Sequence, residues 1–133
     1  MRVFVTGVKG QLGYDVMNEL EKQGLEGIGV DIDEMDITDA DQVNKVIKEA
    51  APDAVIHCAA LKAVGESVQK PLEYYRNNIT GTLTLMDVII QTWTLFSDIP
   101  RQCPVTGTDL KKLLHQFNGI FHSSGTGIRT IIF

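Results

Sequence analysis

The sequence predicts an α/β fold in which helices cover both faces of a parallel sheet. Runs of β-branched and aromatic residues at 2–6, 27–32 and 54–58 are typical of buried strands. Between these runs, residues 11–23 and 39–50 carry apolar side chains at helical spacing. Strands that alternate with helices pair in parallel, because each helix returns the chain to the same end of the sheet.

Glycines delimit the first strand and the first helix. The strand over 2–6 stops at Gly7, and the helix over 11–23 ends before Gly24, a favourable C-terminal stop. The predicted inward face of this helix consists of Leu12, Val16, Met17 and Leu20. A β-strand that leads through a glycine turn into a helix is therefore expected at the N-terminus.

The next elements are marked by acidic residues and a cap. The second strand ends near Asp31, and residues 34–38 are expected to form a short third strand. Thr38-Asp39 caps the following helix, since Asp and Thr side chains accept hydrogen bonds from free backbone N–H groups. This helix is expected to turn Val43, Val46 and Ile47 toward the core.

The chain divides into a regular part and a less regular tail. Pro71 suits the first turn of a further helix, which is expected to run to about Ile90. Residues 1–90 are therefore interpreted as a dinucleotide-binding core. In the tail, residues 91–133, only a short helix over 109–117 and a strand over 129–133 are suggested, and these elements would complete the same domain.

Length and charge exclude several classes of partner. The 133 residues have room for one compact domain, and 44% of them are apolar, which is enough for a packed core. The net charge of −5 and the absence of a basic stripe argue against nucleic acid and acidic membrane surfaces as partners. Cys58 and Cys103 form neither a disulfide framework nor a metal pattern, and no signal peptide is apparent. A cytoplasmic location is therefore expected, without a metal site.

A glycine-rich loop follows the first strand. Thr6-Gly7-Val8-Lys9-Gly10-Gln11-Leu12-Gly13 spaces three glycines between a strand and a helix. In such a loop the first glycine permits the turn, the second lets backbone approach a pyrophosphate, and the third lets helix and strand pack closely. The helix N-terminus adds free N–H groups and a positive dipole. The loop, including Gln11 and Leu12, is therefore predicted to bind a dinucleotide within a Rossmann-type, doubly wound fold.

An acidic residue follows the loop at the expected distance. Asp31 lies 18 positions after Gly13, where its carboxylate can accept both hydroxyls of the adenosine ribose. Because a 2′-phosphate would meet this negative charge, NAD is favoured over NADP, although Lys9 in the loop could offset the preference. Asp36 and Ile37 are expected to flank the adenine. The alternative readings are a solvated aspartate at a strand end, and a plain turn followed by a core residue.

These motifs, together with the small residues Cys58-Ala59-Ala60 at a strand end, resemble the N-terminal part of extended short-chain dehydrogenases/reductases. Residues 1–60, with the loop and Met35-Asp36-Ile37-Thr38-Asp39, resemble the dTDP-4-dehydrorhamnose reductases of that family. Residues 55–88, with the run from Leu61 to Tyr75, resemble its UDP-glucose 4-epimerases. The chain therefore looks like a hybrid of two homologous enzymes, and recombination, an engineered fusion and a sequence-assembly error all remain open.

The resemblance implies roles for four further residues. Ala59, Ala60 and Lys62 would line the central ribose and the nicotinamide side of the cofactor, and Asn78 would contact the cofactor or a nucleotide sugar. The alternative readings are a surface lysine for Lys62 and a solvated helical asparagine for Asn78. The resemblance also implies that the function is that of an NAD(P)-binding domain of a nucleotide-sugar epimerase or reductase.

The catalytic pair of the family has no counterpart in this sequence. In that family a tyrosine exchanges the proton and a lysine four positions later lowers its pKa, whereas Tyr14, Tyr74 and Tyr75 are followed at that distance by Asn, Asn and Ile. Ser124 is at most a relic of the catalytic serine. The chain is therefore expected to be inactive alone. A non-catalytic NAD-binding module and a truncated or hybrid fragment, which could pair with a second copy as a homodimer, are the alternatives.

Overall fold

The computed structural model describes residues 1–94, 120–123 and 129–132 of the chain. They form a five-stranded sheet in the order β2-β1-β3-β5-β4. β1 (Arg2–Thr6) pairs in parallel with the edge strand β2 (Glu26–Val30) on one side and with β3 (Ala54–His57) on the other. β5 (Arg129–Ile132) continues the parallel order beside β3, and β4 (Ile120–Ser123) pairs antiparallel with β5. The predicted parallel α/β fold is thus confirmed, with an antiparallel strand at one edge.

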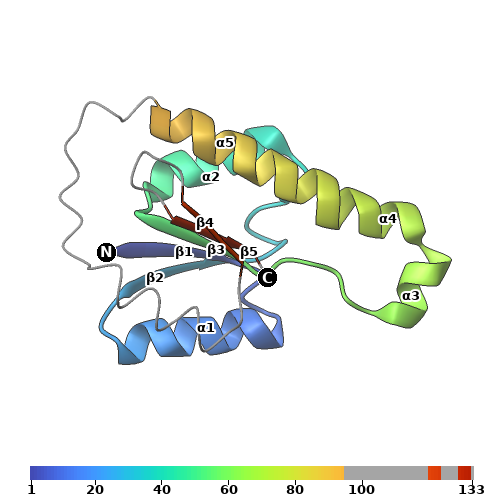
Figure 1. Ribbon diagram of the computed structural model, residues 1–133, viewed down its shortest axis with the longest axis horizontal. Coiled ribbons are helices and arrows are strands. Elements are labelled where there is room, and N and C mark those ends of the chain that lie inside the picture. Colours follow the sequence, from blue (N-terminus) through green and yellow to red (C-terminus); the bar gives the residue numbers. More distant parts are fainter. Residues whose placement is uncertain (95–119, 124–128, 133) are drawn as a thin grey trace.

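Helices cover both faces of this sheet (Figure 1). α1 (Gln11–Lys22) lies on one face, and α2 (Ala40–Ala50) and α5 (Thr82–Thr94) lie on the other. Side chains that alternate along β1 enter different cores: Val3 and Val5 pack toward α1, and Phe4 packs toward α2 and α5. The first core also holds Val16, Leu20, Ala54 and Ile56, and the second holds Val30, Met35, Ile37, Val43, Ile47, Val55, Leu85, Val88 and Ile89.

The predicted cap of α2 is confirmed at Asp39. Its Oδ1 accepts hydrogen bonds from the backbone N–H groups of Asp41 at 3.0 Å and Gln42 at 3.2 Å. These bonds satisfy donors that have no partner inside the helix, and they hold the pKa of the Asp39 carboxyl below its usual value. The residue type at this position therefore explains where α2 begins.

The expected strand over 34–38 is wrong. Met35 and Ile37 are buried and alternate with more exposed neighbours, which is the pattern of a strand. The backbone instead makes turns, in which Met35 N–H donates to the Asp31 carbonyl at 2.9 Å and Asp39 N–H donates to the Asp36 carbonyl at 3.1 Å. Because turn bonds occupy these groups, the segment packs on the second core as a loop without pairing in the sheet.

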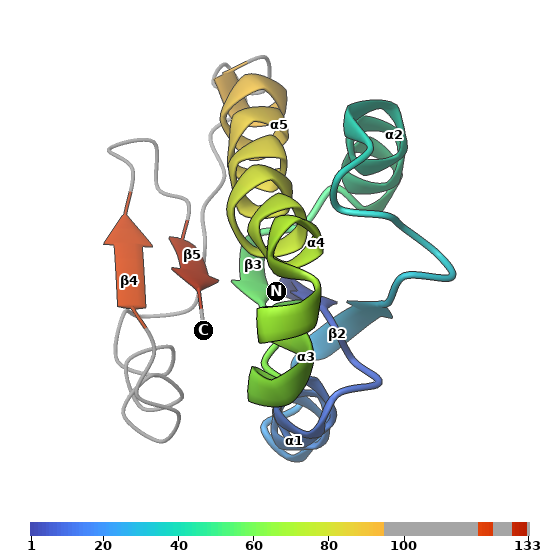
Figure 2. The same cartoon turned by 90° about the vertical axis from the view of Figure 1, so that its right-hand side faces the viewer.

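The helix predicted from Pro71 consists of three successive pieces. α4 (Pro71–Tyr75) passes into a π-helical segment, η1 (Arg76–Gly81), which passes into α5. A separate helix, α3 (Val64–Gln69), precedes it and was not predicted. Figure 2 shows α3, α4 and α5 following one another along one side of the sheet. Arg76 and Asn77 of this π-helical segment line a cleft, and π-helical segments are frequent at functional sites.

The described part of the tail adds β4 and β5 to the sheet. The strand expected over 129–133 is confirmed as β5, where Ala54 pairs with Arg129 and His57 with Ile132. The helix expected over 109–117 and Ser124 lie outside the described residues. No helix in the described ranges is both long and apolar enough to cross a membrane.

Candidate functional site

A cleft of about 800 Å³ opens at the carboxyl ends of β1, β2 and β3. In open α/β sheets this edge is where ligands bind, since the loops that leave neighbouring strands diverge there. The lining residues come from the glycine loop, the turns after β2, the loop after β3, and α4 with η1. They are Thr6, Gly7, Lys9, Gly10, Val30, Asp31, Ile32, Met35, Asp36, Ile37, Thr38, Cys58, Ala59, Ala60, Leu61, Glu73, Arg76 and Asn77.

The glycine loop is packed so closely that side chains would not fit. Gly7 has a φ of +73°, and a Cβ there would lie 2.7 Å from the Cys58 carbonyl carbon. A Cβ on Gly13 would lie 2.2 Å from the Gly7 carbonyl oxygen, because α1 starts directly against the turn. Gly7 N–H donates to the Val30 carbonyl at 2.9 Å, which ties the loop to β2. These contacts explain why two of the three positions require glycine.

The loop presents the N-terminus of α1 to the cleft. Gly10 is the cap residue of α1, and no side chain caps this helix. The first turn contains no acidic side chain that would compete for its N–H groups. An uncapped first turn leaves backbone donors and the positive end of the helix dipole available to an anion.

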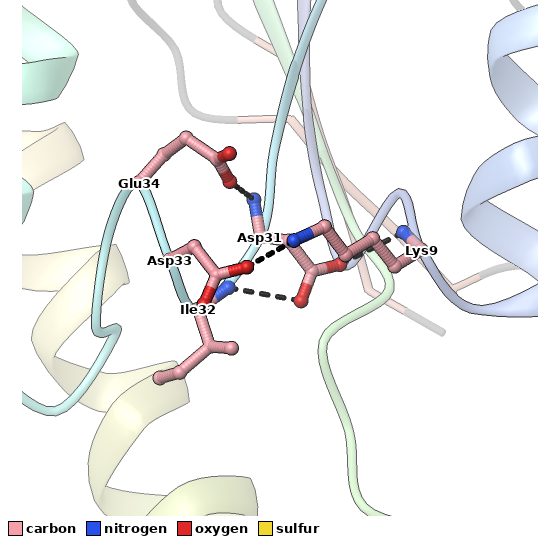
Figure 3. Close-up of polar contacts among 5 residues, drawn as sticks. All are labelled: Lys9, Asp31, Ile32, Asp33 and Glu34. Carbon is pink, nitrogen blue, oxygen red and sulfur yellow. Dashed lines mark hydrogen bonds and ion pairs between the residues drawn. The ribbon is translucent and has the colours of Figure 1, made fainter.

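Asp31 is held in place by backbone donors on both of its oxygens (Figure 3). Lys9 N–H donates to Oδ2 at 2.8 Å, and Ile32 N–H donates to Oδ1 at 2.9 Å. The side chains of the neighbouring turn are engaged as well: Glu34 accepts the Asp31 N–H at 2.9 Å, and the Lys9 ammonium contacts Asp33. Each carboxylate oxygen has two lone pairs, so Asp31 keeps acceptor capacity toward the cleft.

Two adjacent asparagines of η1 bond the backbone of the loop that follows β3. Asn77 donates to the Ala59 carbonyl at 2.8 Å. Asn78 bonds both backbone groups of Leu61, accepting its N–H at 2.8 Å and donating to its carbonyl at 2.9 Å. Asn77 was missed from the sequence, and the signal that could have found it is the pairing of two amide side chains in the middle of a helix. Together the two residues position the loop after β3.

His57 connects the sheet to α5 through two threonines. Thr82 Oγ1 donates to the Asn78 carbonyl at 2.7 Å, so it can only accept from His57 Nε2–H at 3.1 Å. His57 Nδ1 then accepts from the Thr6 hydroxyl at 2.7 Å. This geometry suits the neutral imidazole, and burial lowers the pKa of His57 to about 4. His57 is therefore a structural histidine behind the cleft.

The thiol of Cys58, which lines the cleft, is poorly suited to act as a nucleophile. Burial raises the pKa of its thiol to about 11, and the positive charge of Lys62 opposes this only in part. The thiol is therefore protonated at neutral pH, and the thiolate is the reactive form. Among the described residues no group of three His, Cys, Asp or Glu side chains could hold a metal ion.

The tyrosines of the described segments lie outside the cleft lining. Tyr14 and Tyr75 are 60% and 62% exposed on α1 and α4. Tyr74 is buried, and its hydroxyl donates to Glu66 at 2.9 Å. Burial and the bond to Glu66 raise the pKa of Tyr74. None of the three has access to the cleft, which a proton-transferring tyrosine needs in order to reach a substrate there.

The structure brings together seven of the twelve residues predicted to bind a cofactor. Gly7, Gly10, Asp31, Asp36, Ile37, Ala59 and Ala60 line the cleft. The other five do not line it. Gly13 supports the turn, Leu12 of α1 packs on the first core, and Gln11 is exposed and bonds Asp15. Asn78 bonds Leu61, and Lys62 is exposed. Ile37 also packs on Gly81 at the end of η1, where a Cβ would lie 2.7 Å from its Cδ1.

Known proteins resemble this chain over its regular part. Residues 3–97 match the model of the NAD dependent epimerase/dehydratase family. The UDP-glucose 4-epimerase of Homo sapiens is 52% identical over 67 residues, which cover 50% of this chain and 19% of that protein. The UDP-glucose 4-epimerase of Klebsiella pneumoniae is 37% identical over 111 residues, which cover 67% of this chain and 80% of that protein. The chain thus spans about a fifth of the human relative.

Solved structures share the fold. A dTDP-4-dehydrorhamnose reductase from Clostridium acetobutylicum superposes with a TM-score of 0.65 at 33% identity, over 69% of this chain and 33% of that one. The UDP-glucose 4-epimerase of Thermus thermophilus, solved with NAD, gives a TM-score of 0.66 at 29% identity, over 69% and 34%. The family model covers both halves of the apparent hybrid, from the glycine loop to α5. The chain belongs to the NAD dependent epimerase/dehydratase family.

Proposed function

We propose that this chain binds NAD in the cleft and forms the cofactor-binding part of a nucleotide-sugar epimerase or reductase. The observation that carries the proposal is the convergence of three elements on one cleft: the glycine loop after β1, Asp31 after β2, and Ala59-Ala60 after β3. Solved relatives of both kinds support a dinucleotide cofactor, and the epimerase supports NAD. The UDP-glucose 4-epimerase of Bifidobacterium longum was solved with NAD+ and UDP, and the dTDP-4-dehydrorhamnose reductase of Bacillus anthracis with NADP.

The residues present fit a dinucleotide. Gly10 lines the cleft, and a Cβ there would lie only 3.3 Å from the Gly7 carbonyl oxygen, so glycine suits a close approach of ligand to backbone. The pyrophosphate would lie there, against the uncapped N-terminus of α1. Asp31 would accept the ribose hydroxyls with the lone pairs that Lys9 N–H and Ile32 N–H leave free. When bound, the nicotinamide supplies hydride transfer, and the chain supplies binding and orientation.

A nucleotide sugar is the proposed substrate of the complete enzyme, by analogy with these relatives. The 133 residues contain no Tyr-x-x-x-Lys pair, so we expect the chain alone to bind NAD without converting a UDP-sugar. This absence favours the alternative of a non-catalytic NAD-binding module, whereas the two-part resemblance favours a truncated or hybrid fragment. An epimerase assay of the purified chain, which we expect to show no turnover, separates the enzyme from both alternatives.

Thermal unfolding across a titration of NAD and NADP tests cofactor binding. A ligand that binds only the folded state stabilises it by about 2.7 kcal/mol at a concentration of 100 times Kd. For a domain of this size such a stabilisation raises the Tm by roughly 10 °C. We expect this rise with NAD and a smaller one with NADP. In the Asp31→Ala variant the rise with NAD should shrink, because the ribose hydroxyls lose their acceptor.

The matched control is Asp41→Ala, which removes an exposed carboxylate on α2 that does not line the cleft. It should respond to NAD as the wild type does. A cooperative melt that neither cofactor shifts would refute the proposed NAD site. An equal loss of response in both variants would refute the specific role of Asp31.

A homodimer and a cytoplasmic location stay predictions from the sequence. The structure offers one surface that suits a second copy of the chain. Leu72, Tyr75, Ile79 and Leu83 recur at three- and four-residue spacing along α4, η1 and α5 and are all more than half exposed. Exposed apolar surface of this kind favours association. Size-exclusion chromatography with light scattering should therefore give twice the chain mass for the wild type and less for Leu83→Lys.

A further inference from the structure

The ammonium group of Lys9 is a feature of the cleft that the proposed function leaves unused. Lys9 belongs to the glycine loop and lines the cleft. Its backbone N–H lies 2.8 Å from Asp31 Oδ2, yet its ammonium turns to Asp33 (Figure 3). The side chains of Lys9 and Asp33 are 57% and 69% exposed. A cation thus lies beside the proposed ribose position but is engaged by a second carboxylate.

The three acidic side chains of this turn have different partners. Asp31 accepts backbone N–H groups, Glu34 accepts the N–H of Asp31, and Asp33 engages the Lys9 ammonium. The hydrogen bond from Lys9 to Asp33 is the main reason that the pKa of Lys9 is raised, so this side chain stays protonated in the physiological range. The Lys9 ammonium is therefore charged but engaged by Asp33, which keeps it from a ligand in the cleft.

We propose that Asp33 determines the discrimination between NAD and NADP by holding the Lys9 ammonium away from the 2′-phosphate of NADP. The inference rests on the proposed NAD site, because NADP carries its extra phosphate at the ribose hydroxyl that Asp31 would accept. With Asp33 in place, that phosphate meets the Asp31 carboxylate and a lysine whose ammonium is already paired with Asp33. Without it, the Lys9 side chain is free to turn toward the phosphate, since the Lys9 backbone N–H already bonds Asp31 Oδ2 at 2.8 Å.

The exposure of the pair explains why such a switch is feasible. An exposed ion pair contributes little to stability, since water screens it and two long side chains must be ordered. Loss of Asp33 should therefore leave the fold unchanged and release the lysine. A lysine that gains a phosphate oxygen forms a charge-assisted hydrogen bond, so we expect a gain of about fivefold in NADP affinity.

Glu34→Gln is the matched control for Asp33→Asn. Each substitution removes one negative charge from the same turn, but Glu34 accepts the backbone N–H of Asp31, whereas Asp33 bonds the Lys9 ammonium. A general reduction of repulsion would raise NADP affinity in both variants. Release of Lys9 would raise it in Asp33→Asn alone.

The experiment measures the Kd of NAD and NADP by isothermal titration for the wild type, Asp33→Asn, Glu34→Gln, Lys9→Ala and the Lys9→Ala/Asp33→Asn double variant. We expect Asp33→Asn to bind NADP about fivefold more tightly than the wild type and to bind NAD within about twofold of it. The gain should disappear in the double variant. It should also decrease between low and high salt, because an exposed contact with a phosphate is screened.

Three results with the variants would each overturn the inference while leaving the NAD site intact. They are an unchanged ratio of the two affinities in Asp33→Asn, an equal gain in Glu34→Gln, and a gain that persists in the double variant. A wild type that binds NADP as tightly as NAD would overturn it too, because there would then be no discrimination for Asp33 to determine. A wild type that binds neither cofactor would instead refute the proposed function, and the inference with it.

Discussion

The buried imidazole of His57 should make the stability of this fold depend on pH. The ring is 2% exposed and lies between the hydroxyls of Thr6 and Thr82. Thr82 has already used its hydrogen on the Asn78 carbonyl, so the bonds to the ring are best satisfied by the neutral form. Burial lowers the pKa of His57 to about 4, from the 6.5 of a free side chain. The unfolded chain therefore takes up a proton at this position before the folded chain does.

The sign and size of the effect follow from this difference. The contribution of His57 is fully present above pH ~6.5 and is lost as the pH falls toward ~4, since the unfolded state binds more protons in that window. By pH ~4.5 the loss amounts to about 2.5 kcal/mol in the free energy of unfolding, from 1.36 kcal/mol for each unit of pKa difference. Few single groups in a domain of this size contribute as much.

Urea unfolding followed by circular dichroism at several pH values between 7.5 and 4.5 measures this loss. The comparison is between the wild type and His57→Asn, which cannot take up a proton. The variant will be less stable at neutral pH, because its smaller side chain leaves a cavity and bonds fewer partners. Its stability should fall less steeply on acidification, by about 2.5 kcal/mol over the range. Parallel pH dependences in the two proteins, or an NMR titration of the His57 ring near 6.5, would refute the reasoning.

Two further pairs of substitutions test how the walls of the cleft are built. Gly13→Ala places a methyl group 2.2 Å from the Gly7 carbonyl oxygen, so the turn must shift. We expect the free energy of unfolding, measured by chemical denaturation, to fall by about 1–3 kcal/mol and NAD binding to weaken. The control Gly65→Ala, with nothing within 4 Å of its Cβ, should be neutral or slightly stabilising in the same denaturation. Asn78→Ala removes both hydrogen bonds to Leu61 and should cost about 2 kcal/mol with faster exchange of the Leu61 amide hydrogen. Asn18→Ala, which removes a half-buried helical asparagine without a side-chain bond in the described structure, should leave both unchanged, and equal effects within either pair would contradict these assignments.

The sequence by itself determined the elements whose signals are local. The strand, glycine turn and helix at the N-terminus, the cap at Asp39 and β3 all depend on residues within one or two turns of each other, so periodicity and residue type suffice to predict them. The same holds for Asp31, since the distance from the glycine loop along the chain follows from one βαβ unit. Where a local pattern had no partner strand, as in Met35 and Ile37, the prediction of a strand was wrong.

Only the tertiary structure decided how distant segments meet. The bonds of Asn77 and Asn78 to the loop after β3, the path from Thr6 through His57 to Thr82, and the contact of Lys9 with Asp33 each join residues from different elements. Such hydrogen bonds form only when the two elements lie in the right register. That register is set by tertiary packing and is not encoded in the hydrophobic periodicity of the sequence. The π-helical segment η1 has the same origin, because Asn77 and Asn78 bond the backbone of the loop while Gly81 packs against Ile37.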